Sequence, residues 1–221
     1  MRKAMVFIDF ENFDIAKYNY YKKKALDEAK EEAQRNGQPE PTTAPVNMPR
    51  LDFNELPKQV VGLLSEDHVL VKTFLFAPKP DHFLMADAKR AGTYNWINGL
   101  KNQKYFTVVE GTHSARPVTG YTYRTMSITD PKSYYVEEKG TDINLAAHLI
   151  TKGFMNAYDT AVILSGDTDY IPVLDILDTL GKTTVVVGVQ GQNLHQFVQH
   201  SDDQILIDDT LFQKCLREIK E

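Results

Sequence analysis

Four aspartates stand where strand-like runs end or where the next helix begins. They are Asp9 in VFIDFEN, Asp142 in KGTDINLAAHL, and Asp167 and Asp169 in VILSGDTDY. Carboxylates that converge repel one another and resist ionising together unless a cation lies among them. Four such acids along the chain therefore predict a divalent-metal pocket, and such pockets support phosphodiester chemistry.

The acids also indicate which metal to expect. Magnesium and manganese prefer hard oxygen ligands, keep several waters and need only one or two direct carboxylates each. The chain has no set of His and Cys at the spacing of a structural zinc site. We therefore expect Mg²⁺ or Mn²⁺ as the cofactor, with one ion or two left open.

Each aspartate also has a structural interpretation. Asp142 and Asp169 are placed to cap the helices that follow them, and Asp167 lies in a glycine-containing turn. Asp9 is harder to explain as a cap, since Glu11 follows two residues later. We favour one shared pocket over four separate structural roles.

These acids fall within an alternation of strand and helix patterns. Continuous apolar runs, typical of strands buried on both faces, occupy residues 4–10, 68–78, 105–111, 160–166, 183–189 and 204–208. Helical patterns occupy residues 15–35, 51–66, 81–103, 142–152, 170–180, 193–199 and 211–220. The alternation predicts an α/β fold with a mostly parallel sheet and helices on both faces.

This fold class predicts where the acids meet. In open α/β sheets, sites form beyond the carboxyl ends of the strands, where the strand order reverses. If the first and fourth strands are neighbours, all four carboxylates face one cleft.

We expect one domain over residues 1–221 with two irregular segments. Residues 36–50 contain four prolines and a glycine, which predicts a loop. Residues 117–136 mix β-branched residues and tyrosines with Gly and Asp-Pro turn signals, which predicts an inserted β-hairpin.

The composition is that of an ordinary soluble domain, with 42% hydrophobic and 25% charged residues. A net charge of −5 argues against a broadly basic nucleic-acid binder but is compatible with a local basic rim. The single cysteine, Cys215, excludes an intramolecular disulfide and is interpreted as a packed helix residue. With no signal-peptide pattern and no apolar run of membrane-spanning length, a cytoplasmic protein is expected.

The motifs FIDFEN, KGTDINLAAHLI and AVILSGDTDYIPVLDILDTLGKTTVVVG resemble the NYN domain family. More narrowly, they are similar to the LabA-like branch of the PIN-like nucleases. The resemblance covers the first strand motif and nearly all of residues 137–208, whereas residues 36–136 match only in their strand–helix rhythm. It implies a PIN-like α/β/α sandwich and metal-dependent RNA cleavage.

The resemblance also implies residue roles. The catalytic, metal-binding acids would be Asp9, Asp142, Asp167 and Asp169. Asn12 matches the family's asparagine after the first acid and would position phosphate or a metal-bound water. Lys139 matches the basic residue of the KG-x-D motif and would contact substrate phosphate.

Two further positions are compared with the family. Asp202 corresponds to an aspartate common near the final strand, with an indirect role at the site. LabA-like proteins often carry another aspartate where this chain has His148, which we interpret as a packed or neutral group.

An acidic pocket repels phosphate, so RNA needs a separate basic margin. The candidates are Lys79, Lys89, Arg90, Lys101, Lys104, Arg116 and Arg124. Arg116 and Arg124 flank the predicted hairpin beside several tyrosines, a mixture that suits single strands, although tyrosines on a hairpin more often cover a sheet face.

The leading hypothesis is a metal-dependent endoribonuclease acting on single-stranded or structured RNA. The alternative is a non-catalytic RNA- or protein-binding domain with the same fold, and a third hypothesis is a hydrolase of small phosphate esters. The intact set of four acids favours the enzyme. The RNA target and the oligomeric state, a homo-oligomer included, stay open.

Overall fold

The structure, a computed structural model, describes residues 1–65 and 67–217. In this part of the chain one sheet contains β1 (Arg2–Asp9), β2 (His68–Pro80), β3 (Phe106–Pro117), β4 (Tyr134–Lys139), β5 (Thr160–Leu164), β6 (Thr183–Val189) and β7 (Asp203–Ile207). The α-helices are α1 (Phe10–Arg35), α2 (Leu56–Val61), α3 (Ala88–Gly99), α4 (Thr141–Phe154), α5 (Ile171–Thr179) and α6 (Asp209–Lys214). Short 3₁₀ turns are η1 (Leu84–Ala86), η2 (Leu100–Asn102), η3 (Thr168–Tyr170) and η4 (His195–Phe197).

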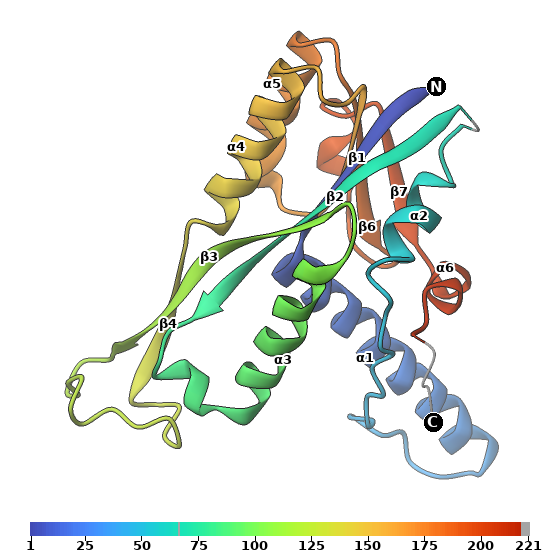
Figure 1. Cartoon of the computed structure of the whole chain (residues 1–221). Helices are drawn as coiled ribbons and strands as arrows, with labels where there is room; N and C mark the ends of the chain where they lie inside the picture. Colours follow the sequence, from blue (N-terminus) through green and yellow to red (C-terminus); the bar gives the residue numbers. More distant parts are fainter. Residues whose placement is uncertain (66, 218–221) are drawn as a thin grey trace.

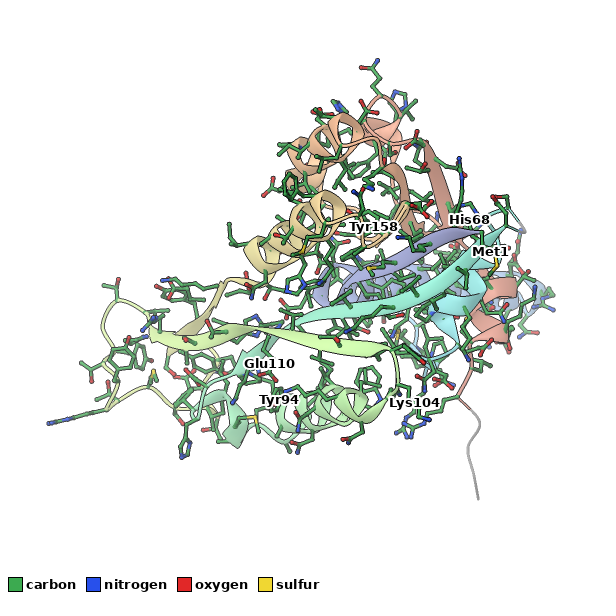
Figure 2. All side chains as sticks on the ribbon, turned by 45° about the horizontal axis from the view of Figure 1, so that its top comes forward. Met1, His68, Tyr94, Lys104, Glu110 and Tyr158 are labelled. Carbon is green, nitrogen blue, oxygen red and sulfur yellow. The ribbon has the colours of Figure 1, made fainter. Side chains whose placement is uncertain are left out.

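The strand order is β4-β3-β2-β1-β5-β6-β7, and all neighbours pair in parallel except β3 and β4. The amino ends of β1 and β2 lie together, as the positions of Met1 and His68 show (Figure 2). The chain builds outward from β1 in one direction and then from β5 in the other, so the order reverses between them. The first and fourth predicted strands, β1 and β5, are therefore neighbours, which is the condition for the acids to meet, and they pair from Ala4↔Thr160 to Ile8↔Leu164.

Helices cover both faces of the sheet (Figure 1). On β1, Ala4, Val6 and Ile8 belong to one buried cluster, shared with α1, α2, α3 and α6. The alternate residues Met5 and Phe7 belong to a second cluster, shared with α4 and α5. This period-2 alternation explains the continuous apolar run, because both faces of β1 are core. The expected PIN-like α/β/α sandwich is confirmed.

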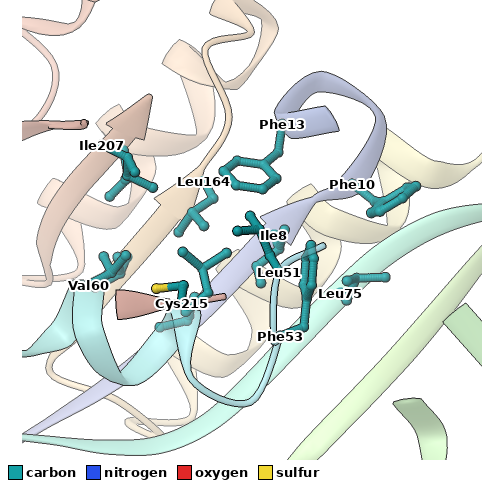
Figure 3. Close-up of a cluster of buried hydrophobic side chains, with 14 of the residues drawn as sticks. Ile8, Phe10, Phe13, Leu51, Phe53, Val60, Leu75, Leu164, Ile207 and Cys215 are labelled. Carbon is teal, nitrogen blue, oxygen red and sulfur yellow. The ribbon is translucent and has the colours of Figure 1, made fainter. Parts of the chain in front are cut away.

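The first cluster also contains the chain's cysteine and the end of its proline-containing segment. Leu51, Phe53 and Cys215 pack with Phe10 and Phe13 of α1 (Figure 3). Cys215 is fully buried, as expected, but it caps α6 rather than lying within it. The helical pattern predicted for residues 211–220 ends at Lys214, and residues 218–220 lie outside the described part of the chain.

Several other predicted elements differ in extent. The pattern at 81–103 forms an α-helix only over Ala88–Gly99, and that at 193–199 forms only a 3₁₀ turn, His195–Phe197. The helix expected at residues 15–35 begins at Phe10, directly after β1. The pattern at 51–66 forms a helix only over Leu56–Val61, with a proline in its first turn, and residue 66 lies outside the described residues. The inserted hairpin is present, but its strands reach beyond 117–136, because β3 ends at Pro117 and β4 continues to Lys139.

Residues 36–50 contain no helix or strand, so the long α1 connects to α2 through an irregular segment. The end of this segment packs into the core at Leu51.

Among the described residues, no helix is long and apolar enough to cross a membrane.

Helix α4 rests directly on β3 at a glycine. A Cβ atom on Gly111 would lie 2.8 Å from the Thr141 nitrogen and 2.9 Å from the Lys139 carbonyl oxygen. Both atoms belong to the backbone that leads from β4 into α4. Only glycine allows this approach, so Gly111 sets the position from which α4 presents Asp142.

We expect Gly111→Ala to lower the free energy of unfolding by about 1–3 kcal/mol, because the added carbon overpacks against backbone atoms. Urea denaturation of the purified variant measures this. The control is Gly99→Ala at the end of α3, where an added Cβ meets nothing within 4 Å. It should be neutral or stabilising by up to about 1 kcal/mol, and equal losses in both variants would contradict the close-packing interpretation.

Candidate acidic active site

Asp9 lies at the centre of a hydrogen-bonded cluster where β1 and β5 end. It is the last residue of β1 and only 5% exposed. Ser165, directly after β5, donates its hydroxyl to Asp9 Oδ2 at 3.0 Å. The Asn12 backbone N–H donates to Asp9 Oδ1 at 3.3 Å, so Asp9 also caps α1. The carboxylate is thereby held at the edge where the strand order reverses.

Asn12 connects the first turn of α1 to the turn after β5. Its side-chain oxygen accepts a hydrogen bond from the Gly166 backbone N–H at 2.9 Å. A Cβ on Gly166 would lie 2.8 Å from Gln192 Nε2, so this turn is closely packed. Asn12 therefore positions the backbone that carries Asp167. Its predicted contact with phosphate or a metal-bound water stays a prediction.

Asp167 and Asp169 follow in the same turn. Asp167 caps η3, since its Oδ1 accepts the Asp169 N–H at 3.0 Å, and its own N–H donates to Ser165 Oγ at 3.2 Å. Asp169 lies in the first turn of η3 and is exposed. Asp169 was predicted as a possible cap of the helix that follows it. The turn η3 comes before α5, and the residue that caps this turn is Asp167.

Tyr170 joins Asp9 to Asp142. Its hydroxyl lies 3.0 Å from Asp142 Oδ1 and 3.5 Å from Asp9 Oδ2, and the residue is only 3% exposed. The hydroxyl has one proton, so at these distances it donates to Asp142 in preference to Asp9. Asp142 does not cap α4: the cap position is Gly140, at φ +88°. The structure therefore brings Asp142 beside Asp9 through a side chain that sequence reasoning missed.

The cluster is electrostatically strained. Burial raises the pKa of Asp9 to about 6, and repulsion from Asp142 and Asp167 adds to this, while the bonds from Asn12 and Ser165 act in the opposite direction. Burial also raises the pKa of Asp142, together with repulsion from Glu138. Burial and the adjacent carboxylates raise the pKa of Tyr170, so its hydroxyl keeps its proton and donates.

Glu138 is a second residue that the motifs did not predict. Its Oε1 accepts the Thr141 backbone N–H at 2.9 Å, at the start of α4. Lys139, one residue along β4, instead lies 3.1 Å from Glu137 Oε1, and its side chain is 65% exposed. Since side chains alternate along a strand, Glu138 faces the start of α4 and Lys139 does not. The predicted contact of Lys139 with substrate phosphate stays a prediction.

The four aspartates suit a cation, although they do not form a complete ligand cage. In residues 1–65 and 67–217, none of the four forms an ion pair with Lys, Arg or His. In the same part of the chain, no three acidic, His or Cys side chains are grouped closely enough to hold a metal together. Mg²⁺ and Mn²⁺ need only one or two direct carboxylates and keep waters, so the oxygen donors fit these ions.

Three other positions are settled by their surroundings. His113 of β3 has its Nε2 3.3 Å from Glu11 Oε2, beside the acidic cluster. His148 packs against Phe74 and Phe76, and burial lowers its pKa, which agrees with a packed neutral group. Asp202 accepts the Thr184 N–H at 2.7 Å near the amino end of β6. It therefore lies at the opposite end of the strands from the acids, and the indirect role expected for it is wrong.

The chain was compared with protein families, curated sequences and solved structures. The profile of the NYN domain matches residues 3–208. A crystal structure of a protein of unknown function from Vibrio parahaemolyticus RIMD 2210633 is similar with a TM-score of 0.49 and 16% sequence identity. The match covers 98% of this chain and 96% of that one. No curated protein sequence is detectably similar to this chain.

The raised pKa of Asp9 predicts a pH-dependent stability. Between the ordinary value of 3.8 and about 6, the folded protein holds a proton that the unfolded chain has lost. Without metal, stability should therefore fall as the pH rises through this window, by at most about 3 kcal/mol. The check is urea denaturation in EDTA at a series of pH values, comparing wild type with Asp9→Asn.

Asn still accepts the capping hydrogen bond but does not titrate, so the Asp9→Asn variant should escape this loss. Asp178→Asn, an exposed position on α5, is the matched control and should follow wild type. Parallel pH profiles for wild type and Asp9→Asn would contradict a strained Asp9 carboxylate.

Proposed function

Because the chain belongs to the NYN domain family, we propose that it is a metal-dependent endoribonuclease that hydrolyses RNA phosphodiester bonds. The observation that supports this most directly is the pairing of Asp9 and Asp142 through Tyr170 at the reversal of the strand order, with Asp167 nearby. Within the family we place the chain in the LabA-like branch of the PIN-like nucleases, on its FIDFEN, KGTD and SGDTDY motifs.

We assign Asp9 and Asp142 to direct coordination of Mg²⁺ or Mn²⁺. Asp167 and Asp169 would act through bound water or at a second ion, since they lie on the adjoining turn. A bound ion supplies charge stabilisation at the scissile phosphate and lowers the pKa of a coordinated water. The chain's own residues prepare this site by orienting its ligands.

Ser165 and Tyr170 supply that orientation. Each donates a hydroxyl hydrogen bond to a carboxylate, and both are buried. Such bonds from outer partners fix the orientation of a carboxylate that binds an ion. Asn12 holds the turn that carries Asp167, as described above. The four elements β1, α4, β5 and η3 therefore act as one unit in the proposed site.

The alternative is a non-catalytic RNA- or protein-binding domain with the same fold. In that case the carboxylates around Asp9 form a structural hydrogen-bond network, and the wild-type protein does not cleave RNA. Replacing one of them then changes only the stability of the domain. Cleavage assays and metal-dependent melts distinguish the endoribonuclease from the binding domain, because each has one outcome that only the binding domain would produce.

We expect Asp167→Asn to reduce metal-dependent RNA cleavage by about ten- to a hundredfold, in line with the loss of a metal-site partner. The fold should persist, since Asn can still cap η3. The measurement is product formation from a fluorescent single-stranded RNA in manganese buffer. Asp178→Asn serves as the control and should cleave like wild type, whereas wild-type rates in Asp167→Asn would remove Asp167 from the site.

The proposed site also predicts metal-linked stability. An ion that binds only the folded protein adds RT ln(1 + [L]/Kd), about 2.7 kcal/mol at a hundredfold excess over Kd. Thermal melts in millimolar manganese should therefore lie above those in EDTA, and the difference should shrink in Asp142→Asn. Superimposable melts of the wild-type protein across a manganese titration would favour the non-catalytic domain.

A further inference from the structure

Two cavities lie side by side between α1 and α3. The smaller has a volume of about 380 Å³, and its lining includes Glu11, Lys89, Arg90, Tyr94 and His113. The larger has a volume of about 1000 Å³ and is lined by residues of α1 and α3 and of the segment from Val46 to Phe53. Phe10, Lys89 and Thr93 line both cavities. The two are thus parts of one continuous depression, which we call the α1–α3 groove.

The groove begins at the acidic cluster. Phe10 and Glu11, which line the smaller cavity, directly follow Asp9 in the chain. His113 contacts Glu11 and pairs across the sheet with Glu138, whose carboxylate accepts the first N–H of α4. If one phosphate of a nucleic-acid strand lies at the four aspartates, the adjacent nucleotide therefore lies at the entrance of this groove.

The groove presents positive charge despite the protein's net charge of −5. Lys89 and Arg90 form no ion pair with any carboxylate in the described part of the chain. Three carboxylates line the groove: Asp14 pairs with Lys17 at 2.8 Å, Glu11 lies 3.3 Å from His113 Nε2, and Asp87 accepts the Arg90 backbone N–H at 2.8 Å. The unpaired cations favour an anionic ligand, and phosphates are the anions that the proposed chemistry requires.

Aromatic side chains line the same groove. Tyr94 is held by a hydrogen bond from its hydroxyl to Glu110 Oε1 at 3.0 Å, and the two lie together in Figure 2. Trp96 packs against Phe10 and Phe53, with ring centroids 5.9 and 5.3 Å away. Tyr18, in the larger cavity, is 43% exposed. Cations combined with aromatic rings suit single strands, whose bases are free to stack, better than duplexes.

The end of the proline-containing segment forms one wall of the groove. Val46, Met48 and Arg50 line the larger cavity. Backbone hydrogen bonds fix this wall, from the Asp52 N–H to the Cys215 carbonyl at 2.8 Å and from the Arg217 N–H to the Arg50 carbonyl at 2.9 Å. The groove is therefore bounded on this side by a segment that the fold holds in place.

We propose that the α1–α3 groove binds single-stranded RNA and holds the nucleotides next to the phosphate that lies at the four aspartates. The smaller cavity is within the roughly 300–1,000 Å³ range of small-ligand pockets and accommodates one nucleotide. Lys89 and Arg90 contact phosphate, and Tyr18 stacks on a base in the larger cavity. The orientation of the RNA toward the acids rests on the proposed function, whereas binding in the groove does not.

Binding is tested with a fluorescein-labelled octauridylate in EDTA, by fluorescence anisotropy across a salt series. Lys89→Glu should weaken binding and make the dependence of log K on log salt shallower by about 1, because a phosphate contact is lost. Tyr18→Ala should weaken binding about fivefold or more through loss of stacking. The control Arg2→Glu reverses an exposed charge at the amino end of β1 and should bind like wild type.

Three results would overturn the proposal. One is an equal loss of affinity in Lys89→Glu and Arg2→Glu, with thermal melts showing that both variants are folded. Another is equal competition by a duplex RNA of the same length. The third is photocrosslinking of a 4-thiouridine oligomer only to residues 118–133, which would favour the hairpin. Crosslinks in α1, α3 or the segment 46–53 support the groove.

The failure of this proposal and the failure of the proposed function are distinguishable. If RNA binding depends on the groove but the wild-type protein shows no manganese-dependent cleavage, the groove remains an RNA site and the ribonuclease proposal is wrong. Manganese-dependent cleavage with a wild-type KM in both Lys89→Glu and Tyr18→Ala would support the ribonuclease and would contradict RNA binding in the groove.

Discussion

The main physical constraint on this structure is the repulsion among the carboxylates of Asp9, Asp142 and Asp167, which the fold brings together near the carboxyl ends of β1 and β5. Asp9 is buried, and its neighbours Asp142 and Asp167 add negative charge, so ionising all three without a cation is unfavourable. Hydrogen bonds from Ser165 and Tyr170 compensate only part of this. The free energy of unfolding of an ordinary protein is only about 5–15 kcal/mol, so this repulsion lowers it by a measurable amount. A cation among these carboxylates would relieve the repulsion.

The position of Asp142 shows how the wider fold supports this cluster. Helix α4 begins immediately after the antiparallel edge strand β4, and its first turn rests on Gly111 of β3. Glu138 caps the first N–H of the helix, and Tyr170 of η3 reaches across to Asp142. The inserted hairpin thus does more than extend the sheet, because its second strand sets where α4 starts.

Charge is divided between two neighbouring regions of the molecule. The acids gather at the carboxyl ends of the parallel strands, whereas Lys89 and Arg90 line the α1–α3 groove beside them. The net charge of −5 opposes the approach of a polyanion. Recognition of RNA would therefore rest on few phosphate contacts and on stacking, which implies a weak dependence on salt and a preference for unpaired bases.

The sequence by itself determined the strands, the fold class and the acids that come near one another, because continuous apolar runs and strand-terminal aspartates are local patterns. Only the tertiary structure decided which side chains connect them. Tyr170 contacts Asp9 from 161 residues away, and His113 of β3 contacts Glu11 of α1. The face that Lys139 occupies depends on its register in β4. Such contacts follow from strand order and side-chain direction, which no local pattern encodes.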